Sequence, residues 1–221
     1  RANARNLDLN RDFIKTDSRN ARSLISAMTM WDPDIYFETH VSNGADHQYV
    51  MELMVSHPEL MDTSLVAYTE KLLVPRQYDW MRSRNIKMGP YFETLHNTPE
   101  QGLTGFVDGP RYSTGYATLR QRIGILSESH MLKPYADRVN ATLQLIFGTL
   151  ACMNEHPKEL LAARKQARAS AEEYLHYATN WSIDTSEVVA HDWSGYAVDT
   201  VTSSVSGSSR IQYDRNRPTD G

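Results

Sequence analysis

Asn10 and Arg11, near the start of the chain, are residue types that could bind an anionic group. They lie in the polar segment Asp8-Leu9-Asn10-Arg11. A guanidinium offers a planar fork of N–H donors that matches the two oxygens of a carboxylate, so an Asn-Arg pair at a strand end can bind a substrate carboxylate. The alternative is a structural ion pair between Arg11 and Asp8 or Asp12, and composition alone favours it.

His40 is the second candidate, because it closes a predicted strand over residues 34–39 and precedes the polar turn Ser42-Asn43-Gly44. In α/β proteins, functional groups gather at the carboxyl ends of the strands. One imidazole nitrogen of His40 could therefore bind a metal ion. The alternative is a hydrogen-bonded histidine at a strand end, which is the commoner situation for a single histidine.

Glu128 is the third candidate, at the end of the apolar run over residues 123–127. Burying a carboxylate is costly unless the group is paired or functional. Burial also raises the pKa of a carboxyl group, which suits a general base that works near neutral pH. A buried salt bridge is the alternative. His130, two residues on, could support the site from behind or simply form hydrogen bonds at a strand end.

The elements that must position these residues alternate between helical and strand periodicity, which is typical of an α/β domain. Helices are predicted from residue 18 to about 30, from Pro58 onward, after Pro134, and from 157 to about 180. Strands are predicted over 34–39 and 123–127. Residues 188–213 are rich in Val, Ser and Thr and read as the beginning of a β-rich extension, with a turn over 203–209.

The two long helices near the end have predicted apolar faces. In the helix after Pro134 this face contains Val139, Leu143, Ile146, Leu150 and Met153. The last helix buries an alanine-rich face, and its basic residues are interpreted as solvated surface rather than as an anion-binding patch. Those basic residues are Lys158, Arg164, Lys165 and Arg168.

The bulk composition limits the function classes. The 221 residues carry a net charge of −4, which gives no electrostatic reason to expect a nucleic-acid partner. No apolar run approaches the length of a membrane span. The single cysteine, Cys152, excludes an internal disulfide. Since the sequence starts at Arg1 and ends in the loop-like run before Gly221, we expect it to be part of a longer protein, and the compartment stays open.

The order of these segments resembles the zinc metallocarboxypeptidase family, and most closely its bacterial branch. The resemblance rests on Leu-Asp-Leu-Asn-Arg-Asp-Phe at 7–13, Thr-His-x-x-Asn-Gly at 39–44 and Glu-x-His-Met-Leu-Lys-Pro at 128–134. It covers roughly residues 1–150. It implies a mixed central β-sheet flanked by helices in a catalytic domain over residues 1–180, with the β-rich extension over 181–221.

The resemblance also implies a role for each candidate residue. His40 matches the third ligand of a single zinc ion, and Glu128 matches the general base. Asn10 and Arg11 match the pair that holds the free carboxylate of a peptide substrate. Arg1 matches the arginine that stabilises the oxyanion, with Arg5 as the second choice if that register is wrong.

The sequence departs from the family pattern at two places. The family binds zinc with a His-x-x-Glu motif upstream of the Asn-Arg pair, so we expect that motif before Arg1 and little activity from these residues alone. The His-x-x-Glu at 156–159 lies downstream and is interpreted as a chance match. The family's catalytic tyrosine position falls near Phe106, which leaves Tyr112 and Tyr116 as candidates for substrate binding.

Two other functions remain open. The first is an N-acyl-amino-acid deacylase of the aspartoacylase and succinylglutamate desuccinylase type, which shares the Asp-Leu-Asn-Arg segment and the histidine turn. The second is a binding domain of the same fold without catalytic activity. In all three cases the expected ligand is a small molecule or peptide with a free carboxylate.

Overall fold

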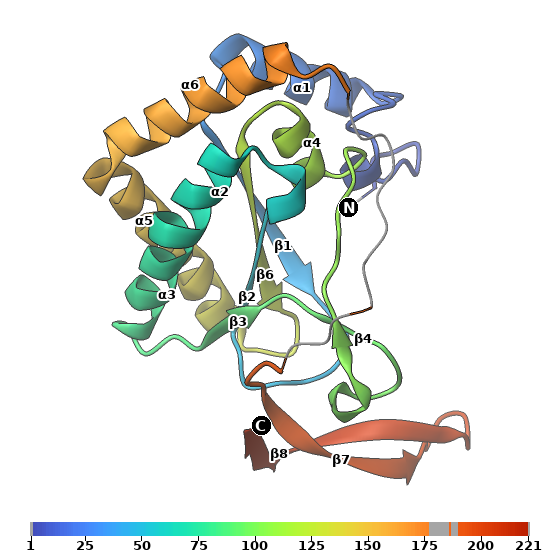
Figure 1. The fold of residues 1–221 in the computed structure, drawn as a ribbon. Helices are drawn as coiled ribbons and strands as arrows, with labels where there is room; N and C mark the ends of the chain where they lie inside the picture. The colour runs from blue at the N-terminus through green and yellow to red at the C-terminus, as the bar shows by residue number, and fades with distance from the viewer. Residues whose placement is uncertain (1, 177–185, 187–189, 221) are drawn as a thin grey trace.

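Four strands form a mixed central sheet in the order β1-β6-β2-β3 (Figure 1). The computed structural model describes residues 2–176, 186 and 190–220. β1 and β6 are parallel, β2 runs antiparallel to β6, and β3 is parallel to β2. The strands are β1 (Ile35–Ser42), β2 (Met51–Val55), β3 (Met88–Pro90) and β6 (Ile123–His130). The expected α/β class, with a mixed central sheet flanked by helices, is confirmed.

β6 lies inside the sheet because its sequence is apolar on both faces. Ile123 and Ile125 are completely buried on one face, and Leu126 is buried on the other. Such continuous burial is typical of a strand that is paired on both sides and covered on both faces. β6 therefore holds Glu128 in the middle of the sheet.

Helices cover both faces of this sheet. Figure 1 shows α2, α3 and α5 on one side and α4 on the other. The first side buries the main apolar core, and the second a smaller cluster of Phe13, Met28 and Tyr116. The helices are α1 (Arg19–Trp31), α2 (Thr63–Tyr68), α3 (Val74–Arg82), α4 (Ser113–Leu119), α5 (Tyr135–Glu155) and α6 (Pro157–Glu173).

Short elements complete the chain. They are the 3-10 helices η1 (Leu9–Arg11), η2 (Pro58–Leu60) and η4 (Pro99–Gln101), the π-helical turn η3 (Thr69–Leu73), and the small strands β4 (Glu93–Thr94) and β5 (Leu103–Thr104). Among the described residues, no helix combines the length and the apolar character needed to cross a membrane.

Several predicted elements are confirmed. The Ser18 side chain accepts the N–H of Ala21 and caps α1 as expected. Both predicted strands extend three residues further, so His40 and Glu128 lie within paired strands and not after them. The last helix ends at Glu173, earlier than predicted.

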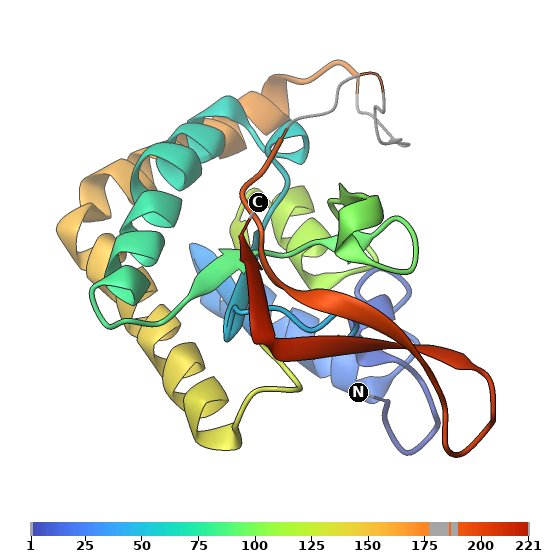
Figure 2. The same ribbon diagram turned by 90° about the horizontal axis from the view of Figure 1, so that it is seen from below.

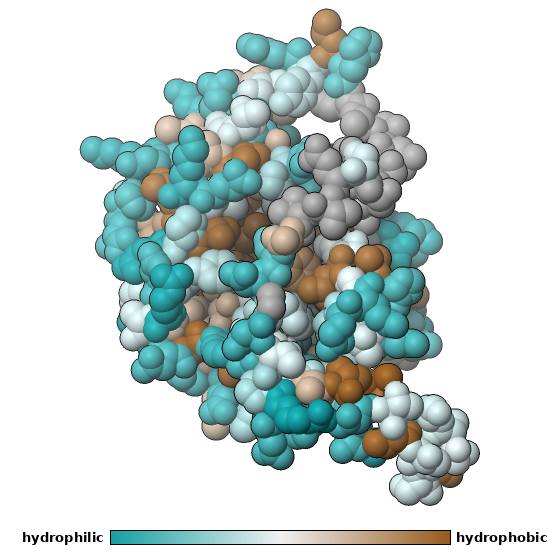
Figure 3. Space-filling view, turned by 60° about the horizontal axis from the view of Figure 1, so that its bottom comes forward, coloured by the Kyte–Doolittle hydropathy of each residue, from teal (hydrophilic) through white to brown (hydrophobic). Residues whose placement is uncertain are grey.

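The C-terminal residues form the hairpin β7 (Ser194–Thr202) and β8 (Ser209–Asp220), in the segment predicted to be rich in strands. This hairpin lies below the rest of the molecule in Figure 1 and crosses in front of it in Figure 2, which is seen from below. Arg215 of β8 pairs with the buried Asp46, and Gln48 donates to the carbonyl oxygen of Gly195. The surface on this side is mostly hydrophilic, with its hydrophobic side chains in small separate groups (Figure 3).

The single helix predicted from Pro58 is wrong. The short helix η2 ends at Leu60, where Met61 becomes extended, and the Asp62 carboxylate then accepts the N–H of Ser64 and caps the start of α2. A π-helical turn then separates α2 from α3 just before Pro75. Pro75 has no N–H to donate into a regular helix, so a local change of hydrogen bonding is expected there.

The predicted core face of α5 is also wrong. Val139, Leu143 and Leu150 are about half exposed, and the buried face consists mainly of smaller residues. Those buried residues are Ala141, Leu145, Gly148, Thr149 and Cys152. Gly148 allows α3 to approach closely, because a Cβ at this position would lie 3.0 Å from Trp80. Large apolar side chains would not fit this contact.

Candidate active site

One face of the sheet carries a row of polar side chains across three strands. Alternation along β1 places Glu38 and His40 on the same face. The register pairs His40 with Glu128 of β6, and Glu128 with Glu52 of β2. Two of the predicted site residues, His40 and Glu128, are therefore direct neighbours although 88 positions separate them in sequence.

The imidazole of His40 lies between two carboxylates. Its Nε2 is 3.1 Å from Oε1 of Glu38, and its Nδ1 is 3.5 Å from Oε1 of Glu128. Burial alone would lower the pKa of His40, but the hydrogen bonds to Glu128 and Glu38 outweigh it and raise the pKa to about 9. The two carboxylates therefore favour the protonated, positively charged form of the His40 imidazole.

Both carboxylates beside His40 keep unused hydrogen-bonding capacity. The Oε2 atoms of Glu38 and Glu128 are buried and have no hydrogen-bond partner among the described residues. The three side chains are between 12% and 24% exposed, so the group lies at an accessible surface and not in the core.

Glu52 extends the row toward β2 and is compensated locally. Two carboxylates directly opposite each other on neighbouring strands repel. Glu52 accepts a 2.6 Å hydrogen bond from Oγ of Ser42, and its Oε1 lies 3.3 Å from Nε2 of His47. These contacts explain how Glu52 can be buried beside Glu128.

His130 supports this network through hydrogen bonds. It is completely buried, and its ring lies edge-on to His47 at 4.3 Å. Nδ1 accepts the N–H of Leu132, so Nε2 carries the proton and donates to the carbonyl oxygen of Ala45. Burial, followed by the charge of His47, lowers the pKa of His130. His130 is therefore a neutral hydrogen-bonding residue at the end of its strand.

Asn10 and Arg11 form a second group, and they lie on a 3-10 helix instead of a strand end. Oδ1 of Asn10 accepts the N–H of Ser113 at the start of α4. Arg11 donates to the carbonyl oxygen of Asn10 at 2.7 Å, and its guanidinium lies 4.2 Å from the ring centre of Tyr112. Helix α4 packs against β1 and β6, so it links this group to the sheet.

The alternative ion pair of Arg11 with Asp12 is absent from the described contacts. The Asp12 carboxylate instead accepts the N–H groups of Asp17 and Ser18, both at 2.8 Å. These hydrogen bonds anchor the turn before α1. The guanidinium of Arg11 lies over the ring of Tyr112 and donates one hydrogen bond, to the carbonyl oxygen of Asn10, and its other N–H groups have no hydrogen-bond partner among the described residues.

The two tyrosine candidates occupy different environments. Tyr112 is in contact with Arg11 and lies edge-on to Phe106 at 5.1 Å. Tyr116 is 9% exposed and packs against Phe13, so its position favours a role in the core. Of the pair, only Tyr112 lies beside the other substrate-binding candidates.

For the two arginine candidates for oxyanion stabilisation, no contact with His40 or Glu128 is seen among the described residues. Arg1 lies outside the described residues. Arg5 is exposed in a turn, where its N–H bonds to Oδ1 of Asn3. The downstream histidine motif is also separate, since His156 stands between α5 and α6 with Nδ1 3.8 Å from Glu159.

Sequence reasoning missed Glu38, Glu52 and Tyr91. Tyr91 follows β3, and its N–H donates to the carbonyl oxygen of Leu53. Burial, and then the negative charges of Glu93, Glu128 and Glu52, raise the pKa of its hydroxyl group. Glu38 could have been found as the same-face neighbour of His40. Glu52 and Tyr91 had no such signal, because β2 was not recognised as a strand.

Asp108 is a buried acid on the loop before α4. It is 1% exposed, and burial raises its pKa to about 7, although N–H groups including that of Gly115 partly offset this effect. Its Oδ2 has no hydrogen-bond partner among the described residues. Gly115 is required there, since a Cβ would lie 2.3 Å from the carbonyl oxygen of Gly109.

We expect Asp108→Asn to stabilise the protein more at pH 8 than at pH 5. A raised folded-state pKa gives stability that is complete below the ordinary value of 3.8 and is lost as pH rises through about 7. Between pH 5 and pH 8 the wild type should lose about 2–3 kcal/mol more of its unfolding free energy than the variant does. Urea unfolding at both pH values measures it, with the exposed Asp192→Asn as control. An equal effect of Asp108→Asn at both pH values would contradict this assignment.

The part of the chain that the structure describes has no group of three or more His, Cys, Asp or Glu side chains arranged to hold a metal ion by itself. Comparison with known protein families, with curated proteins and with solved structures found no match to this chain.

Proposed function

We propose that this chain forms most of the catalytic domain of a zinc-dependent metallocarboxypeptidase, a hydrolase that removes the C-terminal residue of a peptide. The observation that carries the proposal is the contact between His40 and Glu128 on neighbouring strands. Histidine is a common zinc ligand, and a partly buried carboxylate beside it suits a general base. The mixed sheet flanked by helices is compatible with a carboxypeptidase-like fold.

His40 fits one position of a zinc site. The carboxylate of Glu128, which is 12% exposed and lies beside His40, supplies the acceptor that a reacting water needs. A catalytic zinc ion takes three protein ligands and keeps one position open. We therefore propose that the other ligands come from a His-x-x-Glu motif in a segment before Arg1, and that residues 1–221 alone bind zinc weakly and are inactive.

When bound, zinc lowers the pKa of a coordinated water to about 7 and polarises the scissile carbonyl. Glu128 would accept a proton from the attacking water as the water oxygen bonds to the carbonyl carbon, and would pass it to the amine nitrogen as the C–N bond breaks. Arg1 stabilises the oxyanion in this proposal.

Arg11 and Asn10 bind the substrate's terminal carboxylate, which makes the enzyme an exopeptidase. The stacking of Arg11 on Tyr112 supports this role, because it holds the guanidinium in one plane before the substrate arrives. A preorganised group loses less conformational entropy on binding. Tyr112 and Phe106 together form an aromatic wall beside the guanidinium.

The test compares matched peptides with a free or an amidated C-terminus, using the natural protein that carries this sequence and zinc. We expect release of the C-terminal residue from the free acid and at least about 100-fold slower turnover of the amide, because amidation removes the charge that Arg11 binds. Faster hydrolysis of N-acyl amino acids than of peptides would identify the deacylase alternative. Carboxylate binding without hydrolysis of either substrate class would identify a catalytically inert domain.

A further inference from the structure

We infer that Glu38 is a positioning residue for His40, which fixes the orientation and the tautomer of the imidazole so that Nδ1 faces the reaction site. This inference rests on the proposed zinc-dependent function, in which His40 is a metal ligand. Glu38 lies outside the three motifs on which the family resemblance rests.

The first step is the geometry of the pair. Glu38 and His40 are two residues apart on β1, so both side chains project from the same face of the sheet. The Oε1 of Glu38 lies 3.1 Å from Nε2 of His40, which is within the range of a charge-assisted hydrogen bond. Both side chains are about three-quarters buried, so water competes only partly with this contact.

The second step is the tautomer. A carboxylate has only acceptor oxygens, and the shorter of the two contacts, from Nε2 to Glu38, favours the proton on Nε2 over Nδ1. In neutral His40 this places the proton on Nε2 and leaves the lone pair on Nδ1. Nδ1 faces Glu128, and the 3.5 Å separation from its Oε1 is at the outer limit of a hydrogen bond. The nitrogen that can bind a metal ion therefore lies beside the proposed base.

The third step is the expected consequence for metal binding. Metal-ligating histidines commonly donate their second N–H to a carboxylate, which orients the ring and makes the ligand nitrogen more basic. Removing such a carboxylate typically weakens metal affinity about 10–100-fold. If the ion pair between Glu38 and His40 were purely structural, its removal would lower thermal stability. Metal affinity would then fall only as far as the loss of folded protein explains.

The experiment uses Glu38→Gln in the natural protein that carries this sequence, with Glu59→Gln as a matched control. Glu59 also contacts a histidine, with Oε2 2.6 Å from Nδ1 of His57, but this pair is more exposed. Zinc affinity is measured by competition with a chelator. We expect it to fall about 10–100-fold in Glu38→Gln and to stay unchanged in Glu59→Gln. Thermal melting of each variant shows whether folding is retained.

A second measurement separates this inference from the proposed function. Nitrogen-15 NMR reports the tautomer of His40 in the metal-free protein, at a pH high enough for the ring to be neutral. We expect the Nε2–H tautomer in the wild type and a mixture of tautomers in Glu38→Gln. Absence of zinc binding by the wild type would refute the proposed function, and the tautomer would then decide the role of Glu38 alone. An unchanged tautomer, or an unchanged zinc affinity in a zinc-binding protein, would overturn the inference.

Discussion

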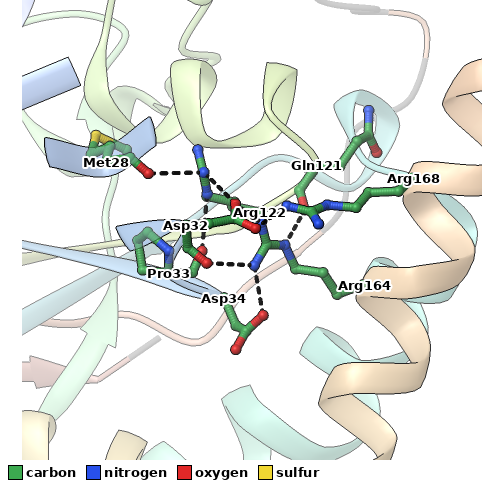
Figure 4. Close-up of polar contacts among 8 residues, drawn as sticks. All are labelled: Met28, Asp32, Pro33, Asp34, Gln121, Arg122, Arg164 and Arg168. Carbon is green, nitrogen blue, oxygen red and sulfur yellow. Dashed lines mark hydrogen bonds and ion pairs between the residues drawn. The ribbon is translucent and has the colours of Figure 1, made fainter. Parts of the chain in front are cut away.

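Asp32→Asn is expected to lower the free energy of unfolding by about 3 kcal/mol, because it removes the charge partner of the buried Arg122 and one of the two partners of the buried Arg164. The Asp32 carboxylate lies 2.6 Å from both Arg122 and Arg164, and it also contacts Arg168 (Figure 4). The side chains of Arg122 and Arg164 are only 2% and 5% exposed. Since Asp32 itself is 40% exposed, water can partly replace it, which places the estimate at the lower end of the range for buried pairs.

This cluster joins three elements that are distant in sequence. Asp32 ends α1, Arg122 precedes β6, and Arg164 belongs to α6. Arg164 also pairs with Asp34 at 2.6 Å and donates to the carbonyl oxygen of Gln121. The interpretation of Arg164 as a solvated surface residue is therefore wrong, because this side chain fixes α6 against the sheet.

The effect of Asp32→Asn should depend on pH. Burial alone would raise the pKa of Asp32, but hydrogen bonds from Arg168, Arg164 and Arg122 lower it well below the ordinary value of 3.8. A lowered pKa gives stability that is present above about pH 4 and is lost as the pH falls further. Asparagine is the suitable replacement because Asp32 has a positive φ of 49°, which asparagine tolerates.

Urea unfolding at neutral pH measures this loss, with Asp79→Asn as the control. Asp79 forms an exposed pair with Arg82 at 3.1 Å, and exposed pairs contribute less than about 1 kcal/mol. A change below about 1 kcal/mol for Asp32→Asn would mean that the arginines are solvated without it.

Glu128→Gln is expected to reduce kcat/KM for a peptide substrate by a factor of about 100 to 10,000 while zinc binding is retained. Glutamine has nearly the same shape as glutamate, but its amide cannot take a proton from water. The neighbouring His40 keeps its place in β1, because the backbone pairing of the two strands is unaffected. Steady-state kinetics and a zinc assay on the natural protein that carries this sequence test both parts.

The matched control is Glu155→Gln, which removes a charge from a surface pair with Arg76. It should leave kcat/KM unchanged. Activity of Glu128→Gln within a factor of a few of the wild type would exclude Glu128 as the general base. Loss of zinc together with activity would instead give it a role in holding the metal.

The site could be predicted from the sequence only as separate residues. The apolar runs before His40 and Glu128 predict strands β1 and β6, because continuous burial requires such runs. Their pairing and register depend on contacts between residues far apart in the chain, which local patterns do not report. The contact between His40 and Glu128 could therefore not be predicted from hydrophobic periodicity along the sequence.

The missed elements have equally physical causes. β2 was not recognised because Glu52 interrupts its apolar sequence, and only Ser42 and His47, from elsewhere in the fold, explain how this carboxylate is buried. The face of α5 was misassigned because hydrophobic periodicity favours large side chains, whereas the packing against α3 selects small ones such as Gly148. Tertiary context decided both outcomes.

The most direct test of the proposed exopeptidase is the ratio of kcat/KM for the free-acid peptide to that for its amide, measured in the wild type and in Arg11→Ala. If Arg11 binds the terminal carboxylate, the ratio should be large in the wild type and close to one in Arg11→Ala. Arg11→Lys should restore it only in part, because an ammonium group lacks the planar fork of a guanidinium. The contradicting result is an equal loss of activity on both substrates with a lower melting temperature, which would make Arg11 a structural residue stacked on Tyr112.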